Sequence, residues 1–255
     1  MLSIGLGSQP TTECGIFGSY QSLNLDGNSD YVSLPSGIRS VVNKSATTVS
    51  AWVNLIQNDG DTSQQIVKIF TDTSNQFQLF YHKFDTEWRS TLKTQGGTVR
   101  MAIYDIPGSS DNDGSGYDDG WQHFAASFSV VSGSYSVRLY RNGSLVQNTA
   151  GGSGQADWSG DISTIHIGAN QDGTGAFVDG QIDQVGIWNI ELPGAAVAAI
   201  YNGGVMRDLT TQHTDYTQTG NLIGYYQFEG NALDSSNTKA HGTLNGTAGF
   251  STNQP

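Results

Sequence analysis

The sequence predicts an all-β fold, a sandwich of antiparallel sheets formed by one domain within a chain of 255 residues. Three observations predict it. Apolar residues alternate with polar ones along many short segments, as they do in half-buried strands. Clusters of Gly, Asn, Asp and Ser separate these segments, as turns do. Only 13% of the residues are charged while 10% are aromatic, which is typical of a loop-rich β protein and not of a disordered chain.

The expected strands follow one another along most of the chain. They lie at 20–26, 47–55, 65–71, 76–82, 98–104, 121–131, 134–141, 161–168, 181–190 and 222–229. The clearest alternation places Phe77, Leu79 and Tyr81 on one face of a strand. Asn142-Gly143 follows 134–141 directly, and Asn-Gly supplies the two positive φ angles of a type I′ turn. The segment 134–148 is therefore predicted to be a β-hairpin.

One helix is expected, near 193–201, within the segment LPGAAVAAIYNGG. Pro193 suits its first turn, Gly203 suits the position just after its end, and Val197, Ile200 and Tyr201 give it a short apolar face. The residues Trp52, Trp121 and Trp188 lie inside apolar strands, so we expect them in the core.

Charge and composition exclude several classes of protein. The net charge of −12 offers no basic surface for nucleic acid. No apolar run approaches the ~18 residues of a membrane-spanning helix, and the N-terminus lacks the basic and apolar regions of a secretory signal peptide. Cys14 is the single cysteine, so no intrachain disulfide forms; it is either a small buried thiol or half of an intermolecular bridge.

Several segments, taken in order, resemble the laminin-G-like branch of the concanavalin A-like lectin/glucanase superfamily. They include SLNLDGNSDYVSLP at 22–35, DDGWQHFAASF at 118–128, SVRLYRNGSLV at 136–146, GQIDQVGIWNI at 180–190 and LIGYYQFEGNALDSSN at 222–237. The resemblance implies a two-sheet jelly roll in one domain over 20–255. Residues 1–19 fall outside the resemblance, and we expect them to form an N-terminal arm that packs on a neighbouring subunit. Similar domains include glycan-binding lectins, receptor-binding modules and structural modules, some of them in phage virions.

The resemblance also raises the question of catalysis. Related glucanases carry Glu-x-Asp-x-x-Glu on one strand, which supplies a nucleophile and an acid/base. The nearest match is QIDQVG at 181–186, where Gln181 and Gly186 replace both glutamates and Asp183 alone remains. We therefore predict a non-catalytic protein. A glycoside hydrolase would need a second carboxylate beside Asp183, from Glu87, Glu191 or Glu229.

Two groups of aspartates are candidate Ca²⁺ sites. Asp111, Asp113 and Asp119 lie in SSDNDGSGYDDG, where oxygen ligands at alternate positions precede a glycine; the alternative is a solvated turn. In similar domains the counterpart of Asp183, together with Asp234, holds either a cation or the amides of a loop. Both alternatives stay open at the level of the sequence.

Lectin sites on this fold combine aromatic rings, which stack on sugars, with polar side chains that bind hydroxyl groups. The candidates beside polar loops are Trp88, Arg89, Tyr104, Asn112, Tyr117 and Trp158. For each aromatic residue the alternative is packing beneath its loop.

The function expected from these observations is that of a non-catalytic structural or recognition module in a surface assembly. We expect it in a virion or another extracellular-facing assembly, as a capsid decoration or a tail or fibre component that forms oligomers with other protein subunits. The alternative is a free carbohydrate-binding lectin that recognises a surface glycan. An atypical glycoside hydrolase is the third hypothesis.

Overall fold

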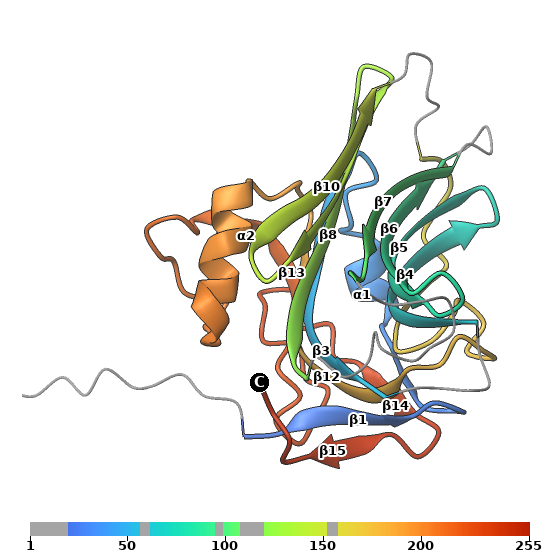
Figure 1. The fold of residues 1–255 in the computed structure, drawn as a ribbon, viewed down its shortest axis with the longest axis vertical. Coiled ribbons are helices and arrows are strands. Elements are labelled where there is room, and N and C mark those ends of the chain that lie inside the picture. The colour runs from blue at the N-terminus through green and yellow to red at the C-terminus, as the bar shows by residue number, and fades with distance from the viewer. Residues whose placement is uncertain (1–19, 57–61, 95–98, 108–119, 152–157) are drawn as a thin grey trace, which may run out of the picture.

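Two antiparallel sheets pack face to face in the computed structural model, which describes residues 20–56, 62–94, 99–107, 120–151 and 158–255 (Figure 1). Sheet A has the order β10 (Ser144–Gly151), β9 (Ser134–Arg141), β8 (Gln122–Val131), β3 (Ala46–Leu55), β12 (Asp179–Trp188), β1 (Ser22–Asp26) and β15 (Gly249–Ser251), and β13 (Leu222–Tyr226) also pairs with β12. Sheet B has the order β14 (Thr243–Asn245), β2 (Tyr31–Ser33), β11 (Thr164–Ile167), β4 (Ser63–Asp72), β5 (Asn75–His82), β6 (Glu87–Lys93) and β7 (Val99–Asp105). The predicted two-sheet sandwich is confirmed.

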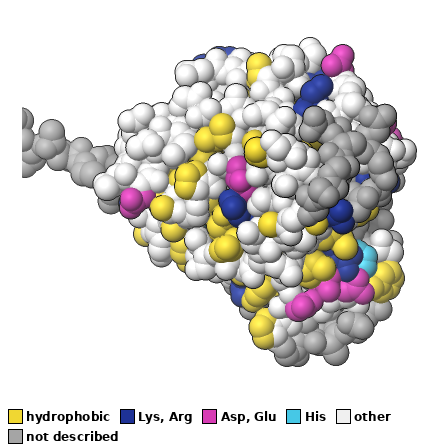
Figure 2. Space-filling model, turned by 90° about the horizontal axis from the view of Figure 1, so that it is seen from above, with side chains coloured by type: hydrophobic (Ala, Val, Ile, Leu, Met, Phe, Trp, Pro, Cys, Tyr) yellow, Lys and Arg dark blue, Asp and Glu magenta, His cyan; other side chains and the backbone are white. Residues whose placement is uncertain are grey.

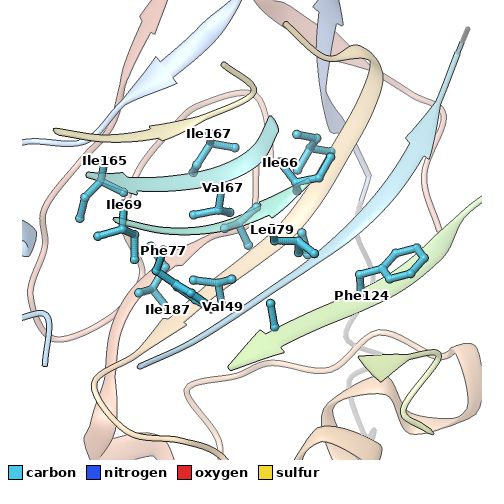
Figure 3. Close-up of a cluster of buried hydrophobic side chains, with 14 of the residues drawn as sticks. Val49, Ile66, Val67, Ile69, Phe77, Leu79, Phe124, Ile165, Ile167 and Ile187 are labelled. Carbon is cyan, nitrogen blue, oxygen red and sulfur yellow. The ribbon is translucent and has the colours of Figure 1, made fainter. Parts of the chain in front are cut away.

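The core lies between the two sheets because each contributes an apolar inner face. Figure 3 shows aliphatic and aromatic side chains of β4, β5 and β11 opposite those of β3, β8 and β12. Phe77 of sheet B meets Phe128 of sheet A with ring centroids 4.7 Å apart. The predicted inward set Phe77, Leu79 and Tyr81 is fully buried, so the period of two in the sequence does mark the face that packs.

The predicted hairpin forms at Asn142-Gly143. Both residues have positive φ, 47° and 75°, as a type I′ turn requires. Asn142 also accepts a hydrogen bond from the His123 amide through Oδ1, at 2.9 Å, and thereby ties the turn to β8.

Helix α2 (Gly194–Tyr201) covers the outer face of sheet A (Figure 1). Its start after Pro193 and its end at the left-handed Asn202 agree with the prediction near 193–201. The helix and the segment after it form a second apolar cluster with sheet A, made of Ala125, Tyr140, Trp188, Leu192, Ala196, Val197, Ile200, Leu209, Tyr216, Leu222 and Tyr225. The short helix α1 (Ser36–Arg39) and the 3-10 turns η1 (Asn202–Gly204) and η2 (Gln218–Asn221) complete the described elements. No helix in these ranges is long and apolar enough to cross a membrane.

Some elements differ from the sequence-based expectations. Strand β6, EWRSTLK, was not predicted because its polar residues mask the alternation, although Trp88, Ser90 and Leu92 point inward and are buried. The short strands β2, β14 and β15 were missed as well. Trp121 was expected in the core, but it precedes β8 and is partly exposed, with Nε1 3.3 Å from Asn253 Oδ1. Trp52 and Trp188 are buried as predicted.

Candidate functional site

The outer face of sheet B presents a line of polar side chains, which we call the polar row: His166, Lys68, Gln78 and Thr91. Cross-strand register places them side by side, since His166 pairs with Lys68, Lys68 with Gln78 and Gln78 with Thr91. Their neighbours along each strand, such as Ile69 and Leu79, are buried in the core. Because side chains alternate along a strand, the polar row points away from the core.

Several outward side chains in and around the polar row are buried. An outward side chain on a flat sheet is normally exposed, yet Lys68 is only 6% exposed and Thr91 only 4%. Gln65, Phe80 and His166 point the same way and are also buried. On the edge strand β7, by contrast, Val99 and Met101 are exposed. Burial is thus uneven across this face: Gln78 is partly exposed, and the edge strand β7 is the most open.

The ammonium of Lys68 is held by neutral groups. Its Nζ donates hydrogen bonds to Gln76 Oε1 and Gln78 Oε1, and it lies 5.8 Å from the ring centroid of Phe70. The pKa of Lys68 is lowered to about 8, chiefly by burial; the charge of Asp172 opposes this shift and that of Lys93 adds to it. In the part of the chain that the structure describes, no carboxylate forms an ion pair with Lys68.

Three buried oxygens on this face have no hydrogen-bond partner among the described residues. They are Gln65 Oε1, Thr91 Oγ1 and Thr164 Oγ1. A buried polar atom without a partner costs free energy, roughly 1–3 kcal/mol, so each such atom in a folded protein calls for an explanation. Because their side chains point away from the core, these oxygens are candidates for hydrogen bonds to the hydroxyl groups of a ligand.

Two phenyl rings flank the polar row. Phe70 lies one step along from Lys68, opposite Gln76, and Phe80 lies on the other side, opposite Gln65 and Arg89. Phe70 is partly exposed and Phe80 is buried. The face therefore combines hydrogen-bonding groups with the partly exposed ring of Phe70, a combination that sugar-binding sites use. In the view of Figure 2, white surface, which includes the backbone and uncharged polar side chains, is more extensive than the yellow or the charged surface.

At one end of the same face, Arg89 is neutralised by carboxylates. Its guanidinium lies 2.6 Å from Glu87 Oε2 and also pairs with Asp85. Burial raises the pKa of Glu87, the pairing with Arg89 lowers it, and the neighbouring Asp105 raises it again. Arg89 was a predicted ligand residue, and the structure places it on the candidate face, with its charge already balanced.

The predicted aromatic ligands Trp88 and Trp158 lie in the core instead. Each is 4% exposed. Trp88 stacks on Phe124 with ring centroids 3.8 Å apart, and Trp158 Nε1 donates to Thr71 Oγ1 at 2.8 Å. The expectation that these rings offer a face to a sugar does not hold in this structure, because Trp88 is on the inward side of β6 and Trp158 packs against Phe128 in the core.

The remaining predicted ligand residues are placed less favourably or not described. Tyr104 of β7 is partly buried and bonded to Arg141, whose guanidinium lies 5.0 Å from its ring centroid. Asn112 and Tyr117 lie outside the described residues.

The structure places one of the two candidate Ca²⁺ sites. Asp111, Asp113 and Asp119 lie outside the described residues. Asp234 Oδ1 accepts hydrogen bonds from the amides of Tyr225 and Ser236, at 2.9 and 2.8 Å. Its Oδ2 accepts the Ser236 hydroxyl and the Ala240 amide, at 3.0 and 2.9 Å. Asp234 therefore holds its loop by hydrogen bonds. Among the described residues no group of three or more His, Cys, Asp or Glu side chains could hold a metal ion.

Asp183 is fully buried in β12, between β3 and the strands on its other side. Its Oδ1 accepts the amide of Gln184, at 2.8 Å, where β12 has a bulge. The glutamates that a hydrolase would need are engaged elsewhere: Glu191 pairs with Arg138 at 2.9 Å, and Glu229 accepts the amides of Tyr20 and Gln21. The strand containing Asp183 is thus part of the scaffold.

A concave region lies beside α2. It has a volume of about 1060 Å³ and is lined by α2 and the segment 207–217, including Arg207, His213 and Asp215. It is separate from sheet B, because α2 packs on the outer face of sheet A.

Sequence reasoning predicted most strands of sheet B but missed the polar row. The one signal was Lys68, a charged residue inside the apolar segment IVKIF of 66–70. A lysine there marks an outward position, but only the register shows which polar side chains lie next to it.

A family model described as the concanavalin A-like lectin/glucanases superfamily matches residues 26–198. No curated protein matches the chain in sequence. Among solved structures, a proposed carbohydrate-binding protein from Bacteroides ovatus matches with a TM-score of 0.58 and 15% identity, over 94% of this chain and 61% of its own. This chain is thus shorter than that relative and spans less than two thirds of its length.

Two further solved structures share the fold at low identity. The CBM40 of the Ruminococcus gnavus IT-sialidase, bound to α2,3-sialyllactose, has a TM-score of 0.50 and 13% identity, over 72% of this chain and all of its own. The binding domain of botulinum neurotoxin serotype G has a TM-score of 0.51 and 16% identity, over 71% of this chain and 42% of its own. At sequence identities this low, the likeness shows a shared fold and nothing about shared ligands.

Proposed function

Because the chain belongs to the concanavalin A-like lectin/glucanase superfamily, we propose that it binds carbohydrate, without catalysis, on the outer face of sheet B. One observation carries the proposal: the outward side chains of Gln65 and Thr91 are buried, and Gln65 Oε1 and Thr91 Oγ1 have no partner among the described residues. Sugar hydroxyl groups both donate and accept hydrogen bonds, so they suit such oxygens.

The aromatic rings support the same function. Phe70 and Phe80 flank the polar row, and a phenyl ring stacks on the apolar face of a pyranose. The similar structures from Bacteroides ovatus and Ruminococcus gnavus are a proposed carbohydrate-binding protein and a carbohydrate-binding module. That likeness is an analogy at the level of the fold, so the proposal depends on the side chains of this chain.

The placement of the candidate carboxylates supports a non-catalytic role. Hydrolysis by a retaining mechanism needs two carboxyl groups, ~5–5.5 Å apart, that both reach the substrate. Asp183 is fully buried, and Glu191 and Glu229 serve in ion pairing and loop hydrogen bonding. Glu87 is on the candidate face but is bound to Arg89.

The test is a glycan array probed with the purified chain, once with calcium and once with EDTA. We expect saturable binding to a restricted set of glycans. Binding that EDTA abolishes would assign the calcium site proposed at Asp111, Asp113 and Asp119 to ligand recognition. An array without any specific signal in either buffer would refute carbohydrate binding.

Two matched variants then locate the site. Thr91→Val removes a hydroxyl group from the polar row, and losing one hydrogen bond of ~1 kcal/mol should weaken binding roughly 5-fold. Thr149→Val makes the same change on β10 of sheet A and should leave the affinity unchanged. Equal affinities for the two variants would move the site away from sheet B.

The structural role in a virion or another surface assembly stays a prediction from the sequence. It requires oligomers or incorporation into particles, which size-exclusion chromatography with light scattering and particle fractionation can measure. A strictly monomeric chain absent from particles would contradict it, whatever the glycan array shows.

A further inference from the structure

We infer that the saccharide bound on sheet B is anionic, and that its carboxylate or sulfate group pairs with Lys68. This inference rests on the proposed function and specifies its ligand class. It begins from the position of Lys68, whose ammonium is buried at the centre of the polar row.

One N–H group of the Lys68 ammonium has no acceptor among the described residues. An ammonium has three N–H groups. Gln76 and Gln78 accept two of them through their side-chain oxygens, and no other acceptor within the described ranges takes the third. Both acceptors are neutral amides, so the positive charge is solvated by dipoles without being balanced. A ligand that reaches this face therefore meets an oriented ammonium with a free donor.

A second lysine, Lys93, lies near Lys68 on the same face. Lys93 of β6 lies in register with Gln76 and is close enough to repel Lys68 electrostatically. Two lysines with the same sign beside each other favour an anion between or above them. Asp172 attracts Lys68, and Asp72 interacts with Lys93, but neither forms an ion pair with these lysines in the described structure.

Two other basic groups on this face, Arg89 and His166, are poor partners for an anion. Arg89 is already paired with Glu87 and Asp85. His166 lies next to Lys68, with Nδ1 2.7 Å from the carbonyl oxygen of Asn170. Burial lowers the pKa of His166, so its ring is neutral at pH 7. Lys68 is therefore the group on this face whose charge calls for an anion.

The acidity of the whole chain does not oppose this ligand at physiological salt. The net charge is −12, but charges farther away than the Debye length of about 8 Å are largely screened at 0.15 M salt. The contacts on the face then decide recognition, and these are Lys68 and Lys93 for the anionic group and Thr91 and Gln65 for hydroxyl groups.

The test compares glycans that differ only in charge. The probes are oligogalacturonate and its methyl ester, sialyllactose and its methyl ester, and chondroitin sulfate and desulfated chondroitin methyl ester, each measured by titration calorimetry. We expect the chain to bind at least one acidic probe and to bind its neutral partner at least 10-fold more weakly. Inorganic sulfate and acetate, added as competitors, separate a saccharide site from a simple anion site, since only the latter is blocked by millimolar concentrations of either.

Variants assign the charge preference to Lys68. Lys68→Met should weaken acidic binding roughly 10- to 100-fold, the range for losing a charged hydrogen bond. Lys239→Met removes an exposed lysine elsewhere and should have no effect. Because Lys68→Met alters a buried position, its melting curve is recorded alongside. A second readout needs no variant: acidic binding by the wild type should weaken between pH 7 and 9.5 as Lys68 deprotonates, while binding of a neutral probe should not.

The outcomes separate this inference from the proposed function. Tight binding of neutral glycans, unaffected by Lys68→Met, would overturn the anionic ligand and leave carbohydrate binding intact. Equal losses in Lys68→Met and Lys239→Met would show a general charge effect and would also overturn it. Failure to bind any glycan would refute both proposals.

Discussion

Replacing Lys68 by Met removes a buried ammonium, and the difference in stability between the two proteins is expected to change with pH. The pKa of Lys68 falls from 10.5 to about 8 on folding because burial disfavours the charged form. Below pH 8 both the folded and the unfolded chain carry the proton, so the folded state bears the full penalty of the buried charge. Between pH 8 and 10.5 the folded state loses the proton first, and the penalty fades as the pH rises.

The size of the effect follows from the pKa shift. A shift of one pKa unit corresponds to about 1.4 kcal/mol, so the penalty is about 3 kcal/mol at pH 7 and about 1.4 kcal/mol at pH 9.5. The wild type should therefore gain about 2 kcal/mol relative to Lys68→Met between these two pH values. Packing differences between Lys and Met cancel, because they do not depend on pH.

The assay is urea unfolding of both proteins at pH 7.0 and 9.5, followed by tryptophan fluorescence. The quantity of interest is the change with pH of the difference between their free energies of unfolding. Lys239→Met serves as the control, since its exposed ammonium should give no such change. A difference for Lys68→Met that stays constant within ~0.5 kcal/mol, well below the expected change, would show that the Lys68 ammonium is solvated, and would remove the basis of the anionic-ligand inference.

Three further predictions concern stability. Asp234→Ala should lower the free energy of unfolding by about 2–4 kcal/mol because four donors lose their acceptor. The control is Asp215→Ala, which changes an exposed side chain and should have little effect. Equal effects of the two variants in urea unfolding would contradict the role of Asp234 in holding its loop. Trp88→Ala should lower the free energy of unfolding by about 3–5 kcal/mol, as expected for a large core side chain. If the variant were instead stable and bound glycans more weakly, Trp88 would be a ligand residue after all. Asn142→Ala should lower the free energy of unfolding by about 1–2 kcal/mol, because alanine disfavours the positive φ and the hydrogen bond to His123 is lost. In thermal unfolding, Asn142→Gly should be less destabilised than Asn142→Ala, since glycine adopts positive φ without strain.

Local patterns in the sequence determined much of the architecture. The alternation at Phe77, Leu79 and Tyr81, the Asn142-Gly143 turn and the Pro193 start of the helix each depend on residues close together in the chain, so each was predicted and is confirmed. The replacement of both catalytic glutamates by Gln181 and Gly186 could also be seen without a structure. Such features survive because backbone geometry and turn chemistry act over a few residues.

Only the tertiary structure decided where the candidate site lies. Alternation divides a strand into two faces but does not say which one the opposite sheet covers, and in sheet A both faces are covered, because α2 packs on the outer one. The same limit explains the tryptophans: Trp88 and Trp158 adjoin polar sequence, yet their rings point inward. Lys68, Gln78 and Thr91 are far apart in the chain and meet only through the register of β4, β5 and β6. Register is set by the packing of whole sheets, so the sequence alone determined the strands, and the fold determined which of their side chains form a surface.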